Sequence, residues 1–247
     1  MLQVSREEID QFLASRDFTG YQSVPLPFHL RVPGEDKSAA VDFYLSGRVE
    51  GRSVLDVGTY YGLYPCEAME RGAVRAVGIE QDPERYAIAR RIAELNGNRY
   101  EIRQCRGEEL DPAEKFDLVL LLNVLHHVTD PIEAVSNIAR LCGDIMLVEF
   151  CLPWDYSNLK FLKGEAGRRH GRMWALARSA LMRCACAGLP VMAVGEREYH
   201  RTFYFSPEAF RNVFVIHNRI FESITFAPSP SSAFRRVAIC RVRQSAA

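Results

Sequence analysis

The segment over residues 53–62 constrains the fold of this chain more than any other. It opens with the short apolar run Ser53–Val57, which is typical of a strand buried inside a sheet. A turn bounded by Gly58 and Gly62 follows, and residues 63–71 then show helical spacing. Because glycine has no Cβ, this turn lets the backbone approach a ligand closely at the carboxyl end of a strand. The segment therefore predicts a strand, a turn and a helix, and the turn taken alone has a purely structural interpretation as its default.

The same alternation continues along the next hundred residues. Asp82, Pro83 and Glu84 are a helix start, with a capping side chain, a proline in the first turn and an acid near the positive end of the helix dipole. Alternating strands and helices predict a parallel sheet with helices on both faces. We expect strands at 76–79, 100–104, 116–122 and 145–150, helices at 82–96 and 130–141, and a final pair of strands at 222–226 and 236–242.

The segments flanking this pattern differ from it. Residues 5–14 predict a short amphipathic helix capped by Ser5, and the prolines of residues 21–36 predict an extended loop before a helix at 39–45. Residues 1–50 are thus expected to form an N-terminal cap and loop, and residues 51–247 the main domain. We expect an insertion at about 153–205 with two helical stretches, the second at 173–186.

Charge and cysteine content limit the class of protein. The chain of 247 residues has 31 basic and 31 acidic side chains, but residues 1–150 carry 16 basic and 25 acidic ones, and residues 151–247 carry 15 and 6. The basic half either faces an acidic ligand or pairs with the acidic half. The seven cysteines include no CxxC pair, the N-terminus has no apolar signal segment, and no apolar run approaches the ~18 residues of a membrane span. These features predict a cytoplasmic protein.

An acidic residue supports a ligand site beside the glycine turn. Glu80 follows the second predicted strand, where a carboxylate can accept hydrogen bonds from both hydroxyls of a ribose. Asp117 at the opening of the fourth strand adds a further acid. The turn itself is neither a dinucleotide GxGxxG nor a P-loop, because it has only two glycines and no Gly-Lys-Ser/Thr follows.

With these motifs the chain resembles the class I S-adenosylmethionine-dependent methyltransferases. The resemblance rests on Val54-Leu55-Asp56-Val57-Gly58-Thr59-Tyr60-Tyr61-Gly62, on Glu80, on Phe116-Asp117-Leu118-Val119-Leu120-Leu121-Leu122-Asn123-Val124-Leu125-His126-His127 and, more loosely, on Tyr204-Phe205-Ser206-Pro207-Glu208. It implies a Rossmann-like, doubly wound α/β fold, with a mostly parallel seven-stranded sheet whose antiparallel last strand lies between its neighbours, an N-terminal helical cap and a helical lid insertion. Within this family, Gly58-Thr59-Tyr60-Tyr61-Gly62 together with Arg71-Gly72-Ala73 resembles the branch that includes tRNA wobble-uridine carboxymethyl-transferring enzymes and their small-molecule relatives.

The resemblance implies S-adenosylmethionine as the cofactor and a set of residues that bind it. This set comprises Asp56, Gly58, Tyr60, Tyr61, Gly62, Glu80, Gln81, Gly107, Glu108 and Asn123. Tyr60 stands where the family has a middle glycine, so that either tyrosine offers an aromatic face to the sulfonium or both pack under the neighbouring helix. Either Glu108 or the Gly107 backbone is expected to meet the adenine.

Catalytic candidates are fewer, because methyl transfer is an in-line displacement that depends chiefly on positioning. A general base is needed only when the acceptor must lose a proton, and His126, His127, Glu149 and His200 are the candidates. His126 also has a purely architectural interpretation. No cluster of ligands at metal spacing is visible, so no metal is expected.

We expect methyl transfer to an O or N atom of a small molecule. Arg168, Arg169 and Arg172 of the insertion favour an anionic acceptor, although a solvated helix face explains them equally well. One alternative is modification of tRNA by methyl or carboxymethyl transfer, but zero net charge makes a nucleic-acid partner the weaker alternative. A second alternative is a non-catalytic cofactor-binding partner or scaffold.

Overall fold

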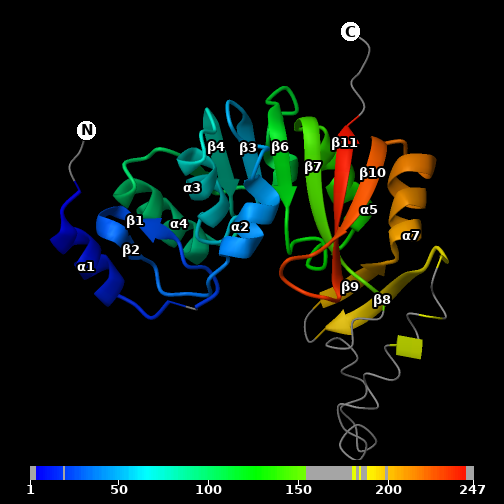
Figure 1. Cartoon of the computed structure of the whole chain (residues 1–247), viewed down its shortest axis with the longest axis horizontal. Coiled ribbons are helices and arrows are strands. Elements are labelled where there is room, and N and C mark those ends of the chain that lie inside the picture. Colours follow the sequence, from blue (N-terminus) through cyan, green and yellow to red (C-terminus); the bar gives the residue numbers. More distant parts are fainter. Residues whose placement is uncertain are drawn as a thin grey trace, which may run out of the picture. The chain divides into compact units, whose positions relative to one another are not determined.

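The computed structural model describes residues 4–18, 20–153, 180–181, 184, 188–197 and 200–242. The chain divides into two compact units (Figure 1). The first unit comprises Met1–Leu121 with Asn137–Ile145, and the second comprises Leu122–Ser136 with Met146–Ala247.

A seven-stranded sheet runs through the described part of the chain in the order β10-β11-β7-β6-β3-β4-β5. Its strands are β3 (Ser53–Val57), β4 (Arg75–Ile79), β5 (Glu101–Arg103), β6 (Phe116–Leu121), β7 (Cys142–Cys151), β10 (Phe221–Pro228) and β11 (Arg235–Val242). β3 pairs in parallel with β4 and β6, β4 pairs in parallel with β5, and β10 pairs antiparallel with β11. The predicted α/β sheet, with the last strand between its neighbours, is confirmed.

The helices begin at the caps that the sequence predicted. Asp82 caps α4 (Pro83–Leu95) by accepting hydrogen bonds from the backbone amides of Glu84 and Arg85, at 3.0 and 2.9 Å. Ser206 caps α7 (Pro207–Arg211) in the same way. The other helices between the strands are α2 (Ser38–Leu45), α3 (Leu63–Glu70) and α5 (Pro131–Ala139), and a π-helix, η5 (Asn212–His217), continues α7.

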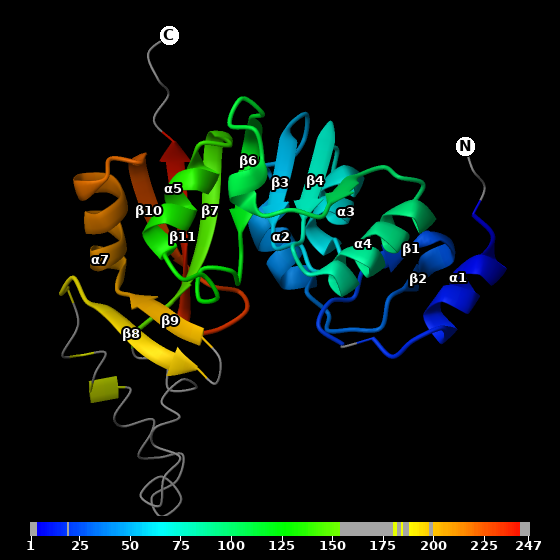
Figure 2. The ribbon, with the colours of Figure 1, turned by 180° about the vertical axis from the view of Figure 1, so that it is seen from behind.

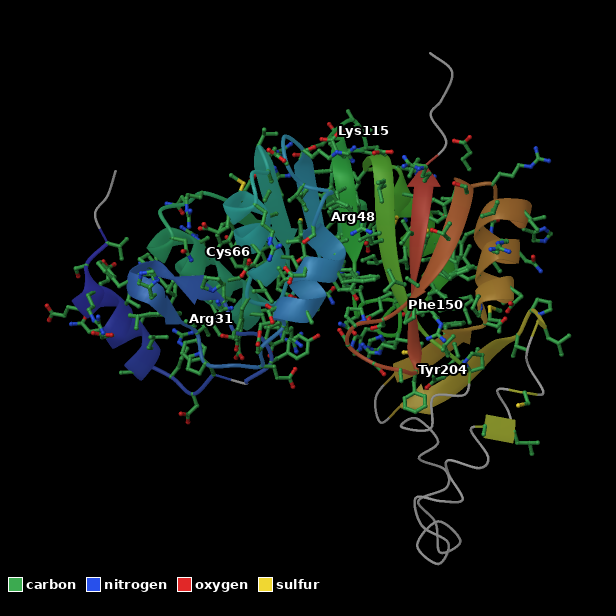
Figure 3. The ribbon with its side chains drawn as sticks, viewed as in Figure 1. Arg31, Arg48, Cys66, Lys115, Phe150 and Tyr204 are labelled. Atoms are coloured by element: carbon green, nitrogen blue, oxygen red, sulfur yellow. The ribbon has the colours of Figure 1, made fainter. Side chains whose placement is uncertain are left out.

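Each unit has its own apolar core. In the first unit, α3 packs on β3 and β4, and α4 packs on β5. The inner strands are almost entirely apolar because they are covered on both faces. In the second unit, Phe150 of β7 stacks on Phe210 with ring centroids 4.6 Å apart, and Phe205 and Phe214 complete this aromatic core. Figure 3 labels Phe150 on β7 and Tyr204 on the strand β9 (His200–Phe205).

The N-terminal segment is more ordered than an extended loop. α1 (Arg6–Ala14) forms as predicted, but Pro25–Leu26 (β1) and Leu30–Arg31 (β2) pair antiparallel within residues 21–36. The chain reverses between them in a short 3₁₀ turn, η1 (Pro27–His29), whose Phe28 and His29 adopt positive φ angles of 60° and 58°. Figure 2 shows β1 and β2 between α1 and α4 in the first unit. The expectation of an extended loop thus misses the short pairing of residues 25–31, which forms because backbone groups packed against protein need partners.

Residues 192–205 also differ from the expected helical insertion. Met192–Arg197 (β8) and His200–Phe205 (β9) form a separate two-stranded antiparallel sheet. Ala180, Leu181 and Cys184 are helical, as predicted for the stretch 173–186. The rest of that stretch, and the arginines Arg168, Arg169 and Arg172, lie outside the described residues. The proposed boundaries of cap, main domain and insertion remain predictions.

Candidate functional site

The glycine turn joins β3 to α3 in the first unit, and its backbone is tied to the end of β4. The amides of Gly58 and Thr59 both donate to the carbonyl oxygen of Ile79, over 2.9 Å each. Gly58 has a φ of 74° and is exposed, whereas Gly62 has a φ of 85° at the N-cap of α3 and is buried. A Cβ on Gly62 would lie 3.3 Å from the Ile102 side chain, so both the backbone conformation and the space favour glycine there.

Glu80 lies directly beside this turn and holds it. The Tyr60 amide donates to Oε2 of Glu80 and the Asp82 amide donates to Oε1, each over 3.0 Å. The Glu80 side chain is buried, at 5% exposure. A carboxylate offers about four lone-pair sites, so two hydrogen bonds leave it able to accept from further donors. Its position fits the ribose hydroxyls of the expected cofactor.

Tyr60 occupies a conformation that L-residues adopt rarely. Its φ is 60°, in the left-handed region, at the position where the resembled family has a glycine. Its ring meets the ring of Tyr21 edge-on at 4.7 Å between centroids and the ring of Tyr61 at 4.4 Å. The guanidinium of Arg85 lies 4.9 Å from the Tyr60 ring centroid. One cation thus already lies over this half-buried ring.

Tyr61 is buried, at 2% exposure, and contacts Phe18 edge-on with centroids 6.1 Å apart. Its amide donates to Oε1 of Gln22 over 3.0 Å. Tyr61 therefore matches the packing interpretation, and the half-buried Tyr60 is the tyrosine with a partly accessible ring. Sequence reasoning missed Gln22, because nothing in its proline-rich surroundings marks it as a neighbour of the turn.

Asp56 lies one residue before the end of β3 and is 2% exposed. Burial raises the pKa of this carboxyl to about 7, the Thr59 hydroxyl lowers it and the charge of Glu80 raises it further. Oδ2 of Asp56 and Oγ1 of Thr59 are both buried. Asp56 is therefore surrounded by polar groups of the turn and its neighbour, the Thr59 hydroxyl and the Glu80 carboxylate.

The remaining cofactor candidates of the first unit follow β4 and β5. Gln81 and Glu108 are exposed, whereas Gly107 is buried at the start of the 3₁₀ turn η2 (Gly107–Glu109). A Cβ on Gly107 would lie 2.9 Å from the Ile138 side chain. The structure brings all three to the same edge of the sheet as Glu80, because parallel strands end at a common edge.

Asp117 lies at the opposite end of the strands from the glycine turn. Near the start of β6, it accepts hydrogen bonds from the amide and hydroxyl of Ser53, over 2.8 and 2.7 Å. These bonds lower the pKa of Asp117. The residue therefore links β3 to β6, and its use as support for a ligand site was wrong.

In the second unit, Asn123 and the two histidines follow β6. Asn123 has a φ of 59°, and in the described part of the chain its Oδ1 is buried without a hydrogen-bond partner. The rings of His126 and His127 lie 4.1 Å apart between centroids. His126 is buried at 5% exposure, whereas His127 is exposed. Of the two, His127 can exchange a proton with solvent more directly.

Glu149 is completely buried near the end of β7 and has charged and polar neighbours. Its Oε1 accepts a hydrogen bond from the Ser229 hydroxyl, and its Oε2 lies 3.4 Å from the Arg235 guanidinium. The Ser229 contact joins β7 to the β10–β11 connection, and the Arg235 contact joins it to the start of β11. Sequence reasoning missed both partners, since 80 or more residues separate them from Glu149. His200 lies in β9, within the separate two-stranded sheet.

Within the described ranges, no three His, Cys, Asp or Glu side chains come together in a way that would hold a metal ion. Among the helices that the structure describes, none has the length and apolar character of a membrane span.

Comparison with known families decides the class of this fold. A family profile described as a methyltransferase domain matches residues 31–214, which is most of the chain. The chain belongs to this methyltransferase family. Its match begins within the N-terminal segment and includes the glycine turn, Glu80, the two histidines and Glu149.

Curated relatives of this methyltransferase match over shorter stretches. A ubiquinone biosynthesis O-methyltransferase of Rhodopseudomonas palustris (strain TIE-1) is 36% identical over 93 residues, covering 38% of this chain and 36% of the relative. A tRNA U34 carboxymethyltransferase of Shewanella denitrificans is 28% identical over 136 residues, covering 53% of this chain and 41% of the relative. The chain thus spans less than half the length of these relatives.

Among solved structures, the N-terminal domain of EvdMO1, crystallised in the presence of SAH and D-fucose, superposes with a TM-score of 0.62. The superposition covers 96% of this chain and 97% of that domain at 18% sequence identity. A likeness at this identity shows that the fold is shared.

Proposed function

We propose that this methyltransferase transfers a methyl group from S-adenosylmethionine to an O or N atom of a small molecule. The observation that carries the proposal is the glycine turn between β3 and α3, whose Tyr60 amide is bound by the buried Glu80 at the end of β4. A buried acid that positions a ligand-facing turn, and still has lone pairs for ribose hydroxyls, is suited to an adenosyl group. The name of the Rhodopseudomonas palustris relative supports oxygen as the acceptor atom.

When bound, the cofactor would supply an electrophilic methyl group on a good leaving group. The residues of the chain would then have three tasks. Glu80, Asp56 and the turn Gly58–Gly62, with Gln81, Gly107 and Glu108 at the same sheet edge, would bind and orient the adenosyl part. Asn123 belongs to the second unit, and its buried amide oxygen would accept a hydrogen bond from a ligand donor. His127, exposed beside His126, is the proposed acceptor of a proton when the acceptor molecule must lose one.

Titration calorimetry with S-adenosylhomocysteine, the demethylated product, tests the cofactor assignment. We expect saturable binding with one site per chain, and the absence of binding would contradict the proposal. The acceptor is then sought by transfer of labelled methyl from S-adenosylmethionine to panels of phenolic, carboxylate-bearing and amine-bearing small molecules.

The Shewanella denitrificans relative supports one second candidate, a tRNA-modifying transferase. Salt-dependent retention of the protein on tRNA, with labelling of that tRNA, would favour this function over a small-molecule acceptor. Binding of S-adenosylhomocysteine without turnover on either class of acceptor would instead favour a scaffold role.

The insertion at about 153–205 is proposed as the lid over the acceptor, with its arginines as the side chains that attract an anionic group. We also propose a cytoplasmic location. It is supported by the thiols, because no disulfide links the six cysteines that the structure describes.

A further inference from the structure

The N-terminal segment Gly20–Lys37 contacts the glycine turn through two adjacent side chains. Gln22 accepts the hydrogen bond of the Tyr61 amide with its Oε1 atom, over 3.0 Å, and is itself 4% exposed. Tyr21 meets the Tyr60 ring edge-on at 4.7 Å. We propose that Gln22 and Tyr21 are positioning residues, which hold the turn in the conformation that binds the cofactor. This inference rests on the proposed function of the turn.

The turn needs outside support because part of it is strained. Tyr60 has a φ of 60°, and this conformation is sterically unfavourable for residues other than glycine. Such residues persist only where their surroundings hold them. Two consecutive amides of the turn are held by side chains from separate elements, the Tyr60 amide by Glu80 and the Tyr61 amide by Gln22. Gln22 thus supplies the second of two fixed points.

Aromatic and cationic groups continue this support across three elements. The Lys37 ammonium lies 4.2 Å from the Tyr21 ring centroid, and the Arg85 guanidinium lies 4.9 Å from the Tyr60 ring centroid. With the contact between the two rings, they form a row in the order Lys37, Tyr21, Tyr60 and Arg85. The row connects the N-terminal segment to the turn and to the first turn of α4.

The segment is itself fixed, so it can serve as a support. The Val32 amide donates to the Val24 carbonyl over 2.9 Å, and the Glu35 amide donates to the Gly20 carbonyl over 2.7 Å. Arg31, labelled in Figure 3, donates to the hydroxyl and the carbonyl of Ser23.

One glycine allows this arrangement around Gln22. A Cβ on Gly34 would lie 2.4 Å from the carbonyl carbon of Gln22, so only glycine permits the two backbones to approach this closely. The backbone of Gln22 is therefore placed by its own segment, and its side chain is free to act on the turn.

Two variants of Gln22 separate positioning from packing. Gln22→Met has a similar length and lacks the acceptor oxygen, whereas Gln22→Glu retains an acceptor oxygen whether or not it is ionised. We measure the dissociation constant of S-adenosylhomocysteine by calorimetry well below each melting temperature, and the exchange rate of the Tyr61 amide by NMR without ligand. Gln22→Met should weaken binding about tenfold, because the loss of one buried hydrogen bond to the turn is about this large. Gln22→Met should also increase the exchange rate of the Tyr61 amide. Gln22→Glu should restore most of the binding affinity and most of the slow exchange.

Variants of Tyr21 give a second test. Because Tyr21 is only half-buried, this test remains informative even where a variant of the buried Gln22 does not fold. Tyr21→Leu removes the ring and should weaken binding severalfold, and Tyr21→Phe should recover most of the loss. Phe28→Leu changes an exposed ring in the same segment and serves as the control.

Failure of this inference is distinguishable from failure of the proposed function. Wild-type protein that does not bind S-adenosylhomocysteine overturns the proposed function and the positioning role together. Wild-type protein that binds it, with folded Gln22→Met and Tyr21→Leu proteins that bind it equally well, overturns the positioning role alone. A merely structural role would lower the melting temperature of both variants and leave the dissociation constants unchanged.

Discussion

The backbone amide of Tyr60 donates a 3.0 Å hydrogen bond to Oε2 of Glu80. The other oxygen of this carboxylate accepts from the Asp82 amide at the start of α4. Glu80 therefore fixes the strained turn and the entry of the next helix before any ligand arrives. We therefore expect its contribution to cofactor affinity to include preorganisation of the turn as well as direct contact.

Replacing Glu80 should weaken cofactor binding strongly. Glu80→Ala removes the proposed ribose acceptor and leaves the Tyr60 and Asp82 amides without their partner, so we expect S-adenosylhomocysteine binding to weaken by about 1.5–3 kcal/mol. Calorimetry measures this loss. Glu84→Gln, which removes an exposed acid four residues away, is the matched control and should stay within about twofold. Equal affinities of Glu80→Ala and wild type would contradict the assignment.

The positive φ of Tyr60 predicts an unusual order of stabilities. Tyr60→Ala and Tyr60→Gly both lose the ring contacts with Tyr21 and Arg85, but only glycine relieves the left-handed strain. Tyr60→Gly should therefore be more stable than Tyr60→Ala by about 1 kcal/mol, the reverse of their order in a helix. Urea unfolding of the two proteins measures this difference. The ordinary order, with alanine more stable, would show that Tyr60 does not hold this conformation in solution.

Replacing Glu149 tests whether this residue anchors the fold or takes part in catalysis. Glu149→Ala leaves the partly buried Arg235 without its carboxylate partner and the Ser229 hydroxyl without its acceptor, so the free energy of unfolding should fall by about 3 kcal/mol or more. Ser229→Ala should cost about 1 kcal/mol. A Glu149→Ala protein of wild-type stability that has lost methyl transfer would instead assign Glu149 to proton transfer.

The raised pKa of Asp56 predicts that the free energy of unfolding declines as pH rises. Its folded-state pKa of about 7 lies above the ordinary value of 3.8, so the folded state favours the protonated form. The contribution of Asp56 is therefore fully present below about pH 4 and is lost as pH rises through about 7, with a slope of up to about 1.4 kcal/mol per pH unit. Asp56→Asn should remove this decline, which unfolding curves between pH 4 and 8 would show.

Asp117 should change the free energy of unfolding with pH in the opposite direction, so it serves as an internal comparison for Asp56. The hydrogen bonds from Ser53 lower its pKa, so its contribution is present above the ordinary value and is lost as pH falls through the folded-state pKa. Asp117→Asn should therefore reduce stability at neutral pH and matter less in acid. If Asp56→Asn and Asp117→Asn changed the pH dependence of the unfolding free energy in the same direction, the argument that burial raises the pKa of Asp56 would be contradicted.

The position of β11 predicts the result of truncation. Because β11 lies between β10 and β7, removing residues 236–247 deletes an interior strand and leaves β10 without its hydrogen-bonded partner. We expect loss of cooperative unfolding in circular dichroism, whereas removal of residues 243–247 alone should have little effect. A truncated protein that melts cooperatively at the wild-type temperature would contradict the strand order.

Local patterns in the sequence were enough to predict the order of strands and helices from Ser53 to Phe150, the caps at Asp82 and Ser206, and the place of Glu80 beside the glycine turn. These features depend on neighbours a few residues apart, such as an apolar run, a capping side chain or a glycine after a strand, and such neighbours are visible in the chain. Family membership follows from the same local motifs.

Which distant side chains meet could be seen only in the folded chain. The hydrogen bond between Gln22 and Tyr61 spans 39 residues and that between Ser229 and Glu149 spans 80. The pairing of β8 with β9, and the separation of Asp117 from the ligand edge, likewise depend on register and on which end of a strand a residue occupies. Contacts of this kind are set by the packing of whole elements, because a backbone amide or a buried carboxylate takes whatever partner the assembled fold brings within reach.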